Sequence, residues 1–200
     1  MLSFAILELL HRKPLSGYDL RKRFSGSITF FWKAGHSQIY PELKRMEREH
    51  LVVSRRVTHP YRPAKKVYAI TPEGEEALRG WLGEAPALQP LKDEMLLKCF
   101  AFHLLEPEQA DQQLAHHAEL HEQRLNHFLE TRRWLAERHG PLSSTRDPIV
   151  FWNAMTLERV IEFERSYVEW CRSALTLHRE FLARTTNGQA RADADVGEQA

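Results

Sequence analysis

The sequence predicts a mainly α-helical protein that carries one small β-hairpin and has two domains. Apolar residues recur at helical spacing along most of the chain, and two segments rich in β-branched residues flank a proline-containing turn. Charge is also divided between the two halves. Residues 1–82 contain 15 Lys and Arg against 8 Asp and Glu, whereas residues 83–200 contain 13 against 19. A basic half of this kind is typical of a domain that contacts a polyanion.

Composition favours a folded protein in the cytoplasm. Hydrophobic residues make up 42% of the chain and aromatic residues 10%, which is enough to bury a sizeable core. The N-terminus has no basic segment before its apolar run, and no uninterrupted apolar stretch reaches membrane-spanning length. We therefore expect neither a signal peptide nor a membrane span. Cys99 and Cys171 lack CxxC spacing and are expected to be buried thiols.

Residues 4–11 and 16–24 predict two helices near the N-terminus. Apolar residues follow helical spacing in the first helix, and Pro14 limits how far it extends. Ser16 is the expected N-cap of the second helix. The last turn of that helix is basic, which suits the negative end of the helix dipole.

A third helix, within residues 37–50, has an apolar side and a basic side. Ile39, Leu43 and Met46 fall at helical spacing and form one stripe. Pro41 is tolerated only in a first turn, so this helix must begin close to Ser37. The side chains that are candidates for contact with a DNA groove are Ser37, Gln38, Tyr40, Lys44, Arg45 and Arg48.

A β-hairpin and a fourth helix follow. Residues 51–58 and 65–70 are rich in β-branched and aromatic residues, and the turn between them contains two prolines. Thr71 then provides an N-cap, with Pro72 at the first helical position. The hairpin cations that are candidates for contact with DNA phosphates are Arg62, Lys65 and Lys66.

This order of elements predicts a winged helix-turn-helix domain over residues 1–84. In such a domain the third helix fits the major groove of DNA, and the hairpin, or wing, reaches phosphates or the neighbouring minor groove. Base-edge contacts would come from Gln38 or an arginine. A second interpretation stays open, because basic faces of amphipathic helices are often only solvated. In that alternative the winged helix is a protein-interaction module that docks an acidic partner and does not bind DNA.

The acidic half predicts a helical domain over residues 91–183, after a linker at residues 85–90. We expect helices over residues 91–105, from Pro107 to about residue 139, and from Pro148 to about residue 182. The middle helix carries apolar residues at a spacing of about 3.5, the pattern of a helix packed along another. The last helix is apolar on more than one face, which indicates burial between partners. Residues 184–200 predict a disordered tail.

Three segments of the basic half together resemble the PadR family of transcriptional regulators. They are GYDLRKRF, SQIYPELKRMEREHLV and KKVYAITPEGEEAL. The resemblance implies a winged helix-turn-helix fold and sequence-specific DNA binding. Two positions depart from the family pattern. Met46 replaces a leucine of similar volume, and His50 replaces a glycine, so a left-handed helix end there would be strained or differently made.

The segment LKDEMLLKCFAF resembles the start of the larger C-terminal domain in the PadR subgroup shared with the virulence activator AphA. This resemblance implies a homodimer, whose two winged domains would read an inverted-repeat operator and would block a promoter as a repressor. Relatives in the family respond to small aromatic compounds, which implies a small aromatic effector. The aromatic residues that are candidates for contact with it are Trp134, Phe151, Trp152 and Trp170. Ordinary core packing is the alternative for all four.

Neither an enzyme nor a cofactor is predicted. The chain has no Walker A loop, no GxGxxG after a strand and no GxSxG, and no motif activates either cysteine. His117 and His121 are one helical turn apart and could share a metal, but HAELH matches neither HExxH nor HxxEH. No third ligand is apparent in the sequence. We therefore predict no metal site, and a pH-sensitive helix seam at His121 stays open.

Overall fold

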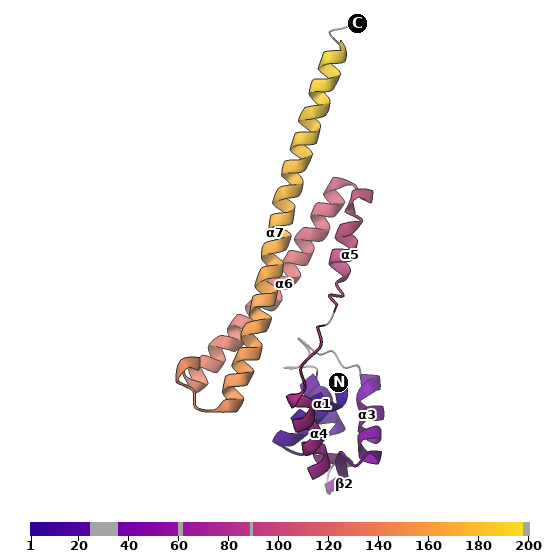
Figure 1. Ribbon diagram of the computed structural model, residues 1–200, viewed down its shortest axis with the longest axis vertical. Helices are drawn as coiled ribbons and strands as arrows, with labels where there is room; N and C mark the ends of the chain where they lie inside the picture. The colour runs from indigo at the N-terminus through magenta and orange to yellow at the C-terminus, as the bar shows by residue number, and fades with distance from the viewer. Residues whose placement is uncertain (25–35, 60–61, 89, 198–200) are drawn as a thin grey trace. The chain divides into compact units, whose positions relative to one another are not determined.

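The computed structural model describes residues 1–24, 36–59, 62–88 and 90–197, with side chains for all of these except residues 36, 59, 62, 63 and 186–197. The chain divides into two compact units, Met1–Pro90 and Leu91–Ala200 (Figure 1). Most of the described residues are helical and the strands form one small sheet, which confirms the predicted mainly α class. Among the helices described, none is long and apolar enough to cross a membrane.

The N-terminal unit builds its core from three helices and the inner part of a hairpin. Its elements are α1 (Leu2–Arg12), β1 (Leu15–Ser16), α2 (Gly17–Phe24), α3 (His36–Arg48), β2 (Val52–His59), β3 (Arg62–Ile70) and α4 (Pro72–Gly83). Its fully buried side chains come from α1, α2 and α3 and include Ile6, Leu7, Leu20, Ile39, Leu43 and Met46. The predicted stripe of the third helix is therefore packed inside the unit. Phe4 and Trp81 stack with ring centroids 4.7 Å apart and join α1 to α4.

The sheet has three antiparallel strands in the order β1-β3-β2, one more than the predicted hairpin. The added strand β1 has two residues, with Leu15 opposite Tyr68 and Ser16 opposite Val67. A two-residue strand is too short to leave an alternating pattern in the sequence. Ser16 also begins α2 as predicted, because its Oγ accepts from the Asp19 backbone N–H at 3.1 Å.

Helix α3 ends in a left-handed residue, His50, with φ at 58°. The backbone N–H of Leu51 donates to Met46 O at 2.9 Å, and the N–H of His50 donates to Glu47 O at 3.3 Å. This pair of hydrogen bonds is the Schellman pattern, which normally uses glycine at the left-handed position. Of the two alternatives left open by the sequence, a strained left-handed end or a differently made one, the structure has the left-handed end, in which His50 adopts a conformation that L-residues disfavour.

Helix α4 begins where the chain returns to the end of α3. Thr71 Oγ1 accepts from the Gly74 backbone N–H at 3.0 Å and donates to His50 O at 2.6 Å. Thr71 therefore caps α4, as predicted, and ties it to the α3–β2 turn. Gly74 lies so close to this turn that a Cβ there would be 2.1 Å from Leu51 O.

The C-terminal unit begins with a shorter helix than predicted. Helix α5 spans Glu94–Phe100, and a separate 3-10 turn follows at Phe102–Leu104. The predicted single helix over residues 91–105 is therefore wrong at both ends. Asp93 explains the start, because its Oδ1 accepts from the backbone N–H of Met95 at 2.8 Å and acts as an N-cap.

Two long helices make up the rest of this unit. Helix α6 (Pro107–His139) and helix α7 (Pro148–Gly197) pack side by side (Figure 1). Gly140, at φ 77°, ends α6, and Asp147 Oδ1 caps α7 through the N–H of Ile149 at 2.8 Å. The side of α6 that faces α7 buries Leu114, Ala118, His121 and Phe128, which follow the spacing of about 3.5 predicted for this helix.

Helix α7 extends beyond its predicted end. The sequence predicted an end near residue 182 and a disordered tail over residues 184–200, whereas the backbone stays helical to Gly197. No proline interrupts this segment, and it contains several alanines and arginines, which have high intrinsic helix propensity. The low apolar content that predicted disorder does not prevent a helix from continuing along its own axis.

Candidate nucleic-acid interface

One face of α3 is exposed and basic. Ser37, Lys44 and Arg48 lie opposite the buried stripe of Ile39 and Leu43, and all three are exposed. Within the described part of the chain, neither Lys44 nor Arg48 makes an ion pair. The three residues recur at helical spacing, so their side chains line one strip of the helix surface. Two exposed cations on a helix whose other side is packed are suited to an anionic partner.

Arg45 differs from Lys44 and Arg48 because two neighbouring carboxylates bind it. Its guanidinium donates to Glu42 Oε1 at 2.6 Å and to Glu49 Oε1 at 2.8 Å. The hydrogen bond with Glu42, the largest cause, raises the pKa of Arg45. Arg45 is half-buried at the side of the basic strip. Because its guanidinium binds Glu42 and Glu49, it could bind another anion only by breaking these two ion pairs.

Gln38 and Tyr40, also predicted to face a groove, are both exposed. Tyr40 also contributes to the packing of α2 on α3. A Cβ at Gly17 would lie 2.6 Å from Tyr40 Cε1, so the ring lies directly against the first residue of α2. Only glycine allows this close approach. Tyr40 therefore fixes the α2–α3 contact while part of its side chain remains at the surface.

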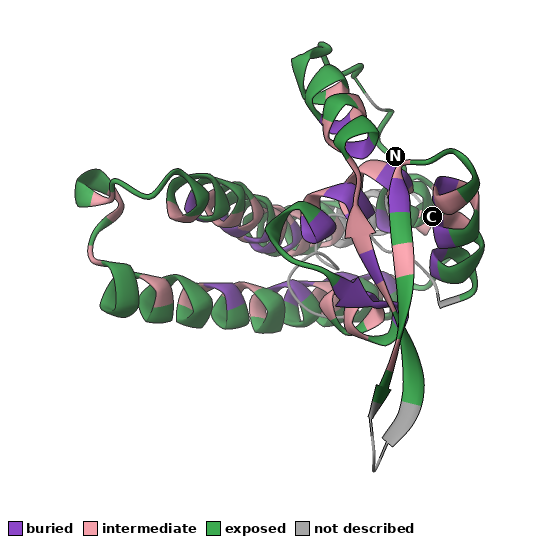
Figure 2. Ribbon diagram, turned by 90° about the horizontal axis from the view of Figure 1, so that it is seen from below, coloured by how far each residue is buried: buried purple, intermediate pink, exposed green. Residues whose placement is uncertain are grey.

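The hairpin extends its outer part away from the core. Figure 2 shows this outer part exposed, and it includes Arg55, Arg56, Lys65 and Lys66. Lys65 makes no ion pair with the described residues. The hydrogen bond from Ser16 is the main cause that lowers the pKa of Asp19, burial opposes it, and the charges of Lys65 and Lys13 add a smaller lowering. Arg62 opens β3, but its side chain lies outside the described part of the structure.

Lys66, the third predicted wing cation, contacts α3. Its Nζ donates to Glu47 Oε2 at 2.8 Å and lies 5.2 Å from the centre of the Tyr68 ring. Glu47 also accepts from Ser54 Oγ in β2. The sequence did not indicate this role of Glu47, because its two partners lie 7 and 19 positions away and no local pattern places them beside α3.

The four aromatic residues predicted to bind an effector do not gather in one place. Phe151 and Trp152 touch edge to face, with ring centroids 5.2 Å apart, whereas Trp170 packs on Tyr167 at 5.5 Å. Trp134 and Trp152 are more than half exposed. These two side chains are therefore not packed in the core of a single chain, which was the alternative to effector binding. The guanidinium carbon of Arg138 lies over the Trp134 ring, 5.7 Å from the ring centre.

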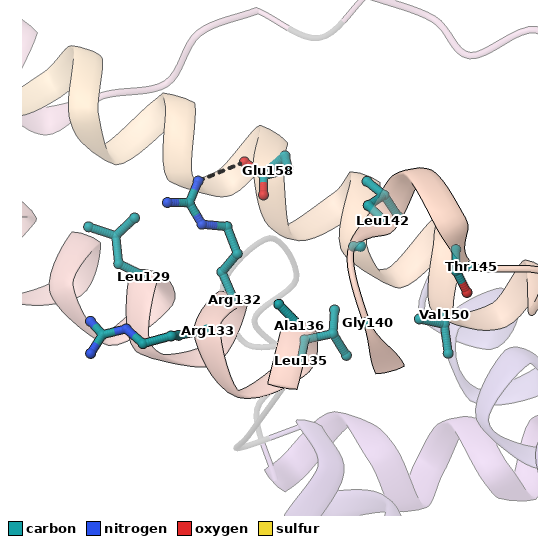
Figure 3. Close-up of a pocket in the computed structure, with 11 residues that line it drawn as sticks. Leu129, Arg132, Arg133, Leu135, Ala136, Gly140, Leu142, Thr145, Val150 and Glu158 are labelled. Carbon is teal, nitrogen blue, oxygen red and sulfur yellow. Dashed lines mark hydrogen bonds and ion pairs between the residues drawn. The ribbon is translucent and has the colours of Figure 1, made fainter. Parts of the chain in front are cut away.

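A pocket of about 490 Å³ lies between the end of α6 and the start of α7 (Figure 3). None of the four predicted aromatic residues lines it. Its wall is mostly aliphatic, with Leu129, Leu135 and Val150 among the lining residues. Arg132 and Glu158 also line it and form an ion pair of 3.4 Å, the dashed line in Figure 3.

A polar cluster is buried in the seam between α6 and α7. His121 Nδ1 and Glu164 Oε2 are 2.5 Å apart, and since a carboxylate only accepts, the histidine nitrogen donates. Arg124 lies 2.8 Å from the other carboxylate oxygen. His117 Nε2 lies 3.2 Å from His121 Nε2, and burial, followed by the charge of His121, lowers the pKa of His117. In the described residues, no three His, Cys, Asp or Glu side chains are placed to hold a metal.

Two short helices, a third helix with an exposed basic strip, and a hairpin beside it define a winged helix-turn-helix domain. The model of the transcriptional regulator PadR-like family matches residues 6–80, and the model named virulence activator alpha C-term matches residues 91–179. The negative transcriptional regulator PadR of Bacillus subtilis is 31% identical over 178 residues, which cover 88% of this chain and 97% of that protein. The chain belongs to the PadR-like family of transcriptional regulators, as its sequence motifs indicated.

Solved structures agree with this assignment. Bacillus subtilis PadR in complex with operator DNA aligns with a TM-score of 0.77 and covers 88% of this chain and 98% of its own at 31% identity. The same protein in complex with p-coumaric acid gives 0.73, with 89% and 98% covered at 31% identity. The Vibrio cholerae virulence activator AphA gives 0.71 at 28% identity, with 90% and 99% covered.

Proposed function

We propose that this chain is a homodimeric repressor that binds an inverted-repeat DNA operator through α3 and the hairpin. The observation that carries this proposal is the strip of Ser37, Lys44 and Arg48, exposed on a helix whose other side is packed. The packed backbone of the helix needs no further ordering, which lowers the entropy lost on binding to that of the side chains. The relative from Bacillus subtilis is described as a negative regulator and was solved with operator DNA, which supports repression and binding to an operator.

In this proposal α3 lies in the major groove and the hairpin contacts the flanking backbone. Ser37, Gln38 and Tyr40 are at the N-terminal end of α3, the end that usually approaches base edges. Lys44 and Arg48 would contact phosphates, together with Lys65 and Arg62 of the hairpin. Arg45 has a smaller role than the sequence predicted, because Glu42 and Glu49 already bind it.

A second copy of the chain would cover apolar surface that one protomer leaves exposed. Helix α7 packs one face on α6 through Ala154, Ile161 and Val168. Large apolar side chains elsewhere in this unit are exposed, including Leu97, Phe100, Trp134, Phe151, Trp152, Leu177 and Phe181. Monomeric proteins rarely expose so many large apolar side chains in one unit. The two-sided apolar pattern of α7 therefore supports a homodimer through the C-terminal unit.

A small aromatic acid is the proposed effector that releases DNA. The complex of the Bacillus subtilis relative with p-coumaric acid supports this ligand class. The pocket between α6 and α7 has the size of a small-molecule site, and its aliphatic wall and two arginines suit a ring that carries a carboxylate. Such a ligand would need to bind the DNA-free form of the dimer more tightly than the DNA-bound form.

Removal of the cations of the basic strip tests the interface. Lys44→Ala and Arg48→Ala are each expected to weaken binding to operator and unrelated duplexes alike, because a phosphate contact carries little sequence information. Each should lower the slope of log K against log salt by about 1 per protomer. Fluorescence anisotropy at several salt concentrations measures both quantities. Arg165→Ala, which removes an ion-paired cation from α7, is the control and should leave the slope unchanged.

The alternative, a module that docks an acidic protein, predicts a different result. A protein-docking surface need not follow polyphosphate, so unrelated duplex DNA at low salt would fail to bind or compete. Unchanged salt slopes in both strip variants would exclude α3 as the DNA-contacting surface.

A further inference from the structure

Glu47 connects α3 to both strands of the hairpin. Its side chain accepts hydrogen bonds from Ser54 Oγ of β2 and from Lys66 Nζ of β3, the latter at 2.8 Å. These contacts span 7 and 19 positions of the sequence, so they are tertiary links and not local helix pairs. The two hydrogen bonds, that from Lys66 first, lower the pKa of Glu47. Glu47 is thus a carboxylate held at the junction between the basic strip and the hairpin.

The register of the hairpin explains why a carboxylate is needed at this junction. Lys66 stands directly opposite Arg56, and Ser54 stands opposite Tyr68. Side chains two residues apart along a strand share a face, so Ser54, Arg56, Lys66 and Tyr68 lie on the same side of the hairpin. Two cations directly opposite each other repel. The carboxylate of Glu47 offsets this repulsion and fixes Lys66 toward α3.

We propose that Glu47 is a positioning residue for DNA binding, which holds the hairpin at the orientation that lets α3 and the wing contact one duplex together. This inference rests on the proposed DNA-binding function. In it, Lys66 acts through Glu47 and is not a phosphate contact. Lys65 and the other outer cations of the hairpin make the phosphate contacts once Glu47 has oriented the strands.

Electrostatics alone predicts that removal of Glu47 strengthens DNA binding, the opposite of what a positioning role predicts. A carboxylate beside a DNA-binding surface repels phosphates, so its removal should strengthen binding if it has no positioning role. Removal would also release the Lys66 ammonium to contact DNA. The sign of the change in DNA affinity on removal of Glu47 therefore shows whether Glu47 positions the hairpin or only repels phosphates, whatever the size of the change.

Glu47→Ala and its matched control, Glu49→Ala, test this sign in the full-length chain. Both remove one carboxylate from the same part of the chain, but Glu49 binds Arg45 and not the hairpin. We expect Glu47→Ala to weaken binding to duplex DNA from immediately upstream of the chain's own gene about fivefold, a factor within the range of coupled neighbouring residues. Glu49→Ala should bind equally or more tightly. Tighter or unchanged binding by Glu47→Ala would overturn the proposal.

Lys66→Met extends the test to a double-mutant cycle. Methionine keeps the stem of Lys66 over the Tyr68 ring and removes only the ammonium group. We expect Lys66→Met to weaken binding about as much as Glu47→Ala, and the double variant to be no weaker than either single variant. Additive losses would overturn the proposal, because they would mean that Lys66 contacts DNA independently of Glu47.

Two further measurements separate positioning from loss of folding or of DNA binding. Urea unfolding of Glu47→Ala should match the wild type closely, since the ion pair is solvent-accessible. Hydroxyl-radical footprints should lose protection at the flanks, where the wing binds, and keep it at the centre of each half-site. Loss of DNA protection at the flanks and at the centre of each half-site together would overturn the positioning role. Absence of binding by the wild type would contradict the proposed function itself, a result distinct from any outcome of the variants.

Discussion

Gly74→Ala is expected to lower the free energy of unfolding by about 2–3 kcal/mol, the upper range for insertion of a methyl group into a tightly packed site. The added Cβ would lie 2.1 Å from Leu51 O and 2.9 Å from Ile70 Cγ1. The first of these is a backbone atom that also accepts a hydrogen bond from Thr71 N, so it cannot move without loss of that bond. The clash would separate α4 from the α3–β2 turn.

Gly80→Ala in the same helix is the matched control. No atom of the described neighbours lies within 4 Å of a Cβ at Gly80, so the change adds only the higher helix propensity of alanine. We expect it to raise the free energy of unfolding by about 0.5–1 kcal/mol. Urea titrations of both variants, followed by circular dichroism, measure the two effects. Equal stability of the two variants would contradict the packing described at Gly74.

His121→Leu is expected to lower the free energy of unfolding by about 3 kcal/mol or more, because it removes one partner of a fully buried carboxylate. Glu164 has no exposed surface, and among the described residues the variant leaves it only Arg124, whose contact with it lacks hydrogen-bond geometry. Leucine approximates the volume of histidine, so a cavity adds little to the cost. Urea unfolding of the full chain measures the loss.

The double variant His121→Leu/Glu164→Leu separates the lost pair from lost packing. It removes the buried charge together with its partner and replaces both with apolar groups. We expect it to be more stable than His121→Leu alone, since well-packed apolar residues often replace a buried pair without loss. Losses that add across the two substitutions would contradict a coupled pair.

Sequence reasoning predicted the elements whose signals are local. The apolar stripe of Ile39, Leu43 and Met46, the cap at Thr71 and the start of α7 at Pro148 depend on spacing and on neighbouring residues, and all three are confirmed. The strand β1 was missed because two residues carry no periodicity. The end of α7 was misplaced because polar composition suggests disorder, whereas a continuing helix needs only propensity.

The site was harder to predict than the fold, because the charge on a residue does not specify its partner. Lys44, Arg45 and Lys66 looked alike in sequence, but only Lys44 lacks an ion pair with the described residues. The partner of Lys66 is 19 positions away and depends on how the hairpin returns to α3. Likewise, no pattern in the sequence tells whether aromatic residues of one helical unit share a pocket. This applies to Trp134, Phe151, Trp152 and Trp170.

The measurement that tests the account most directly is a titration of the full-length chain into duplex DNA from immediately upstream of its own gene. Fluorescence anisotropy would follow binding at several salt concentrations, with a scrambled duplex of equal length as the control. We predict preferential binding to the upstream duplex, with two protomers per site and affinity that falls steeply with salt. Absence of binding to either duplex at low salt would contradict the account, and would leave the basic strip of α3 as a surface for an acidic protein.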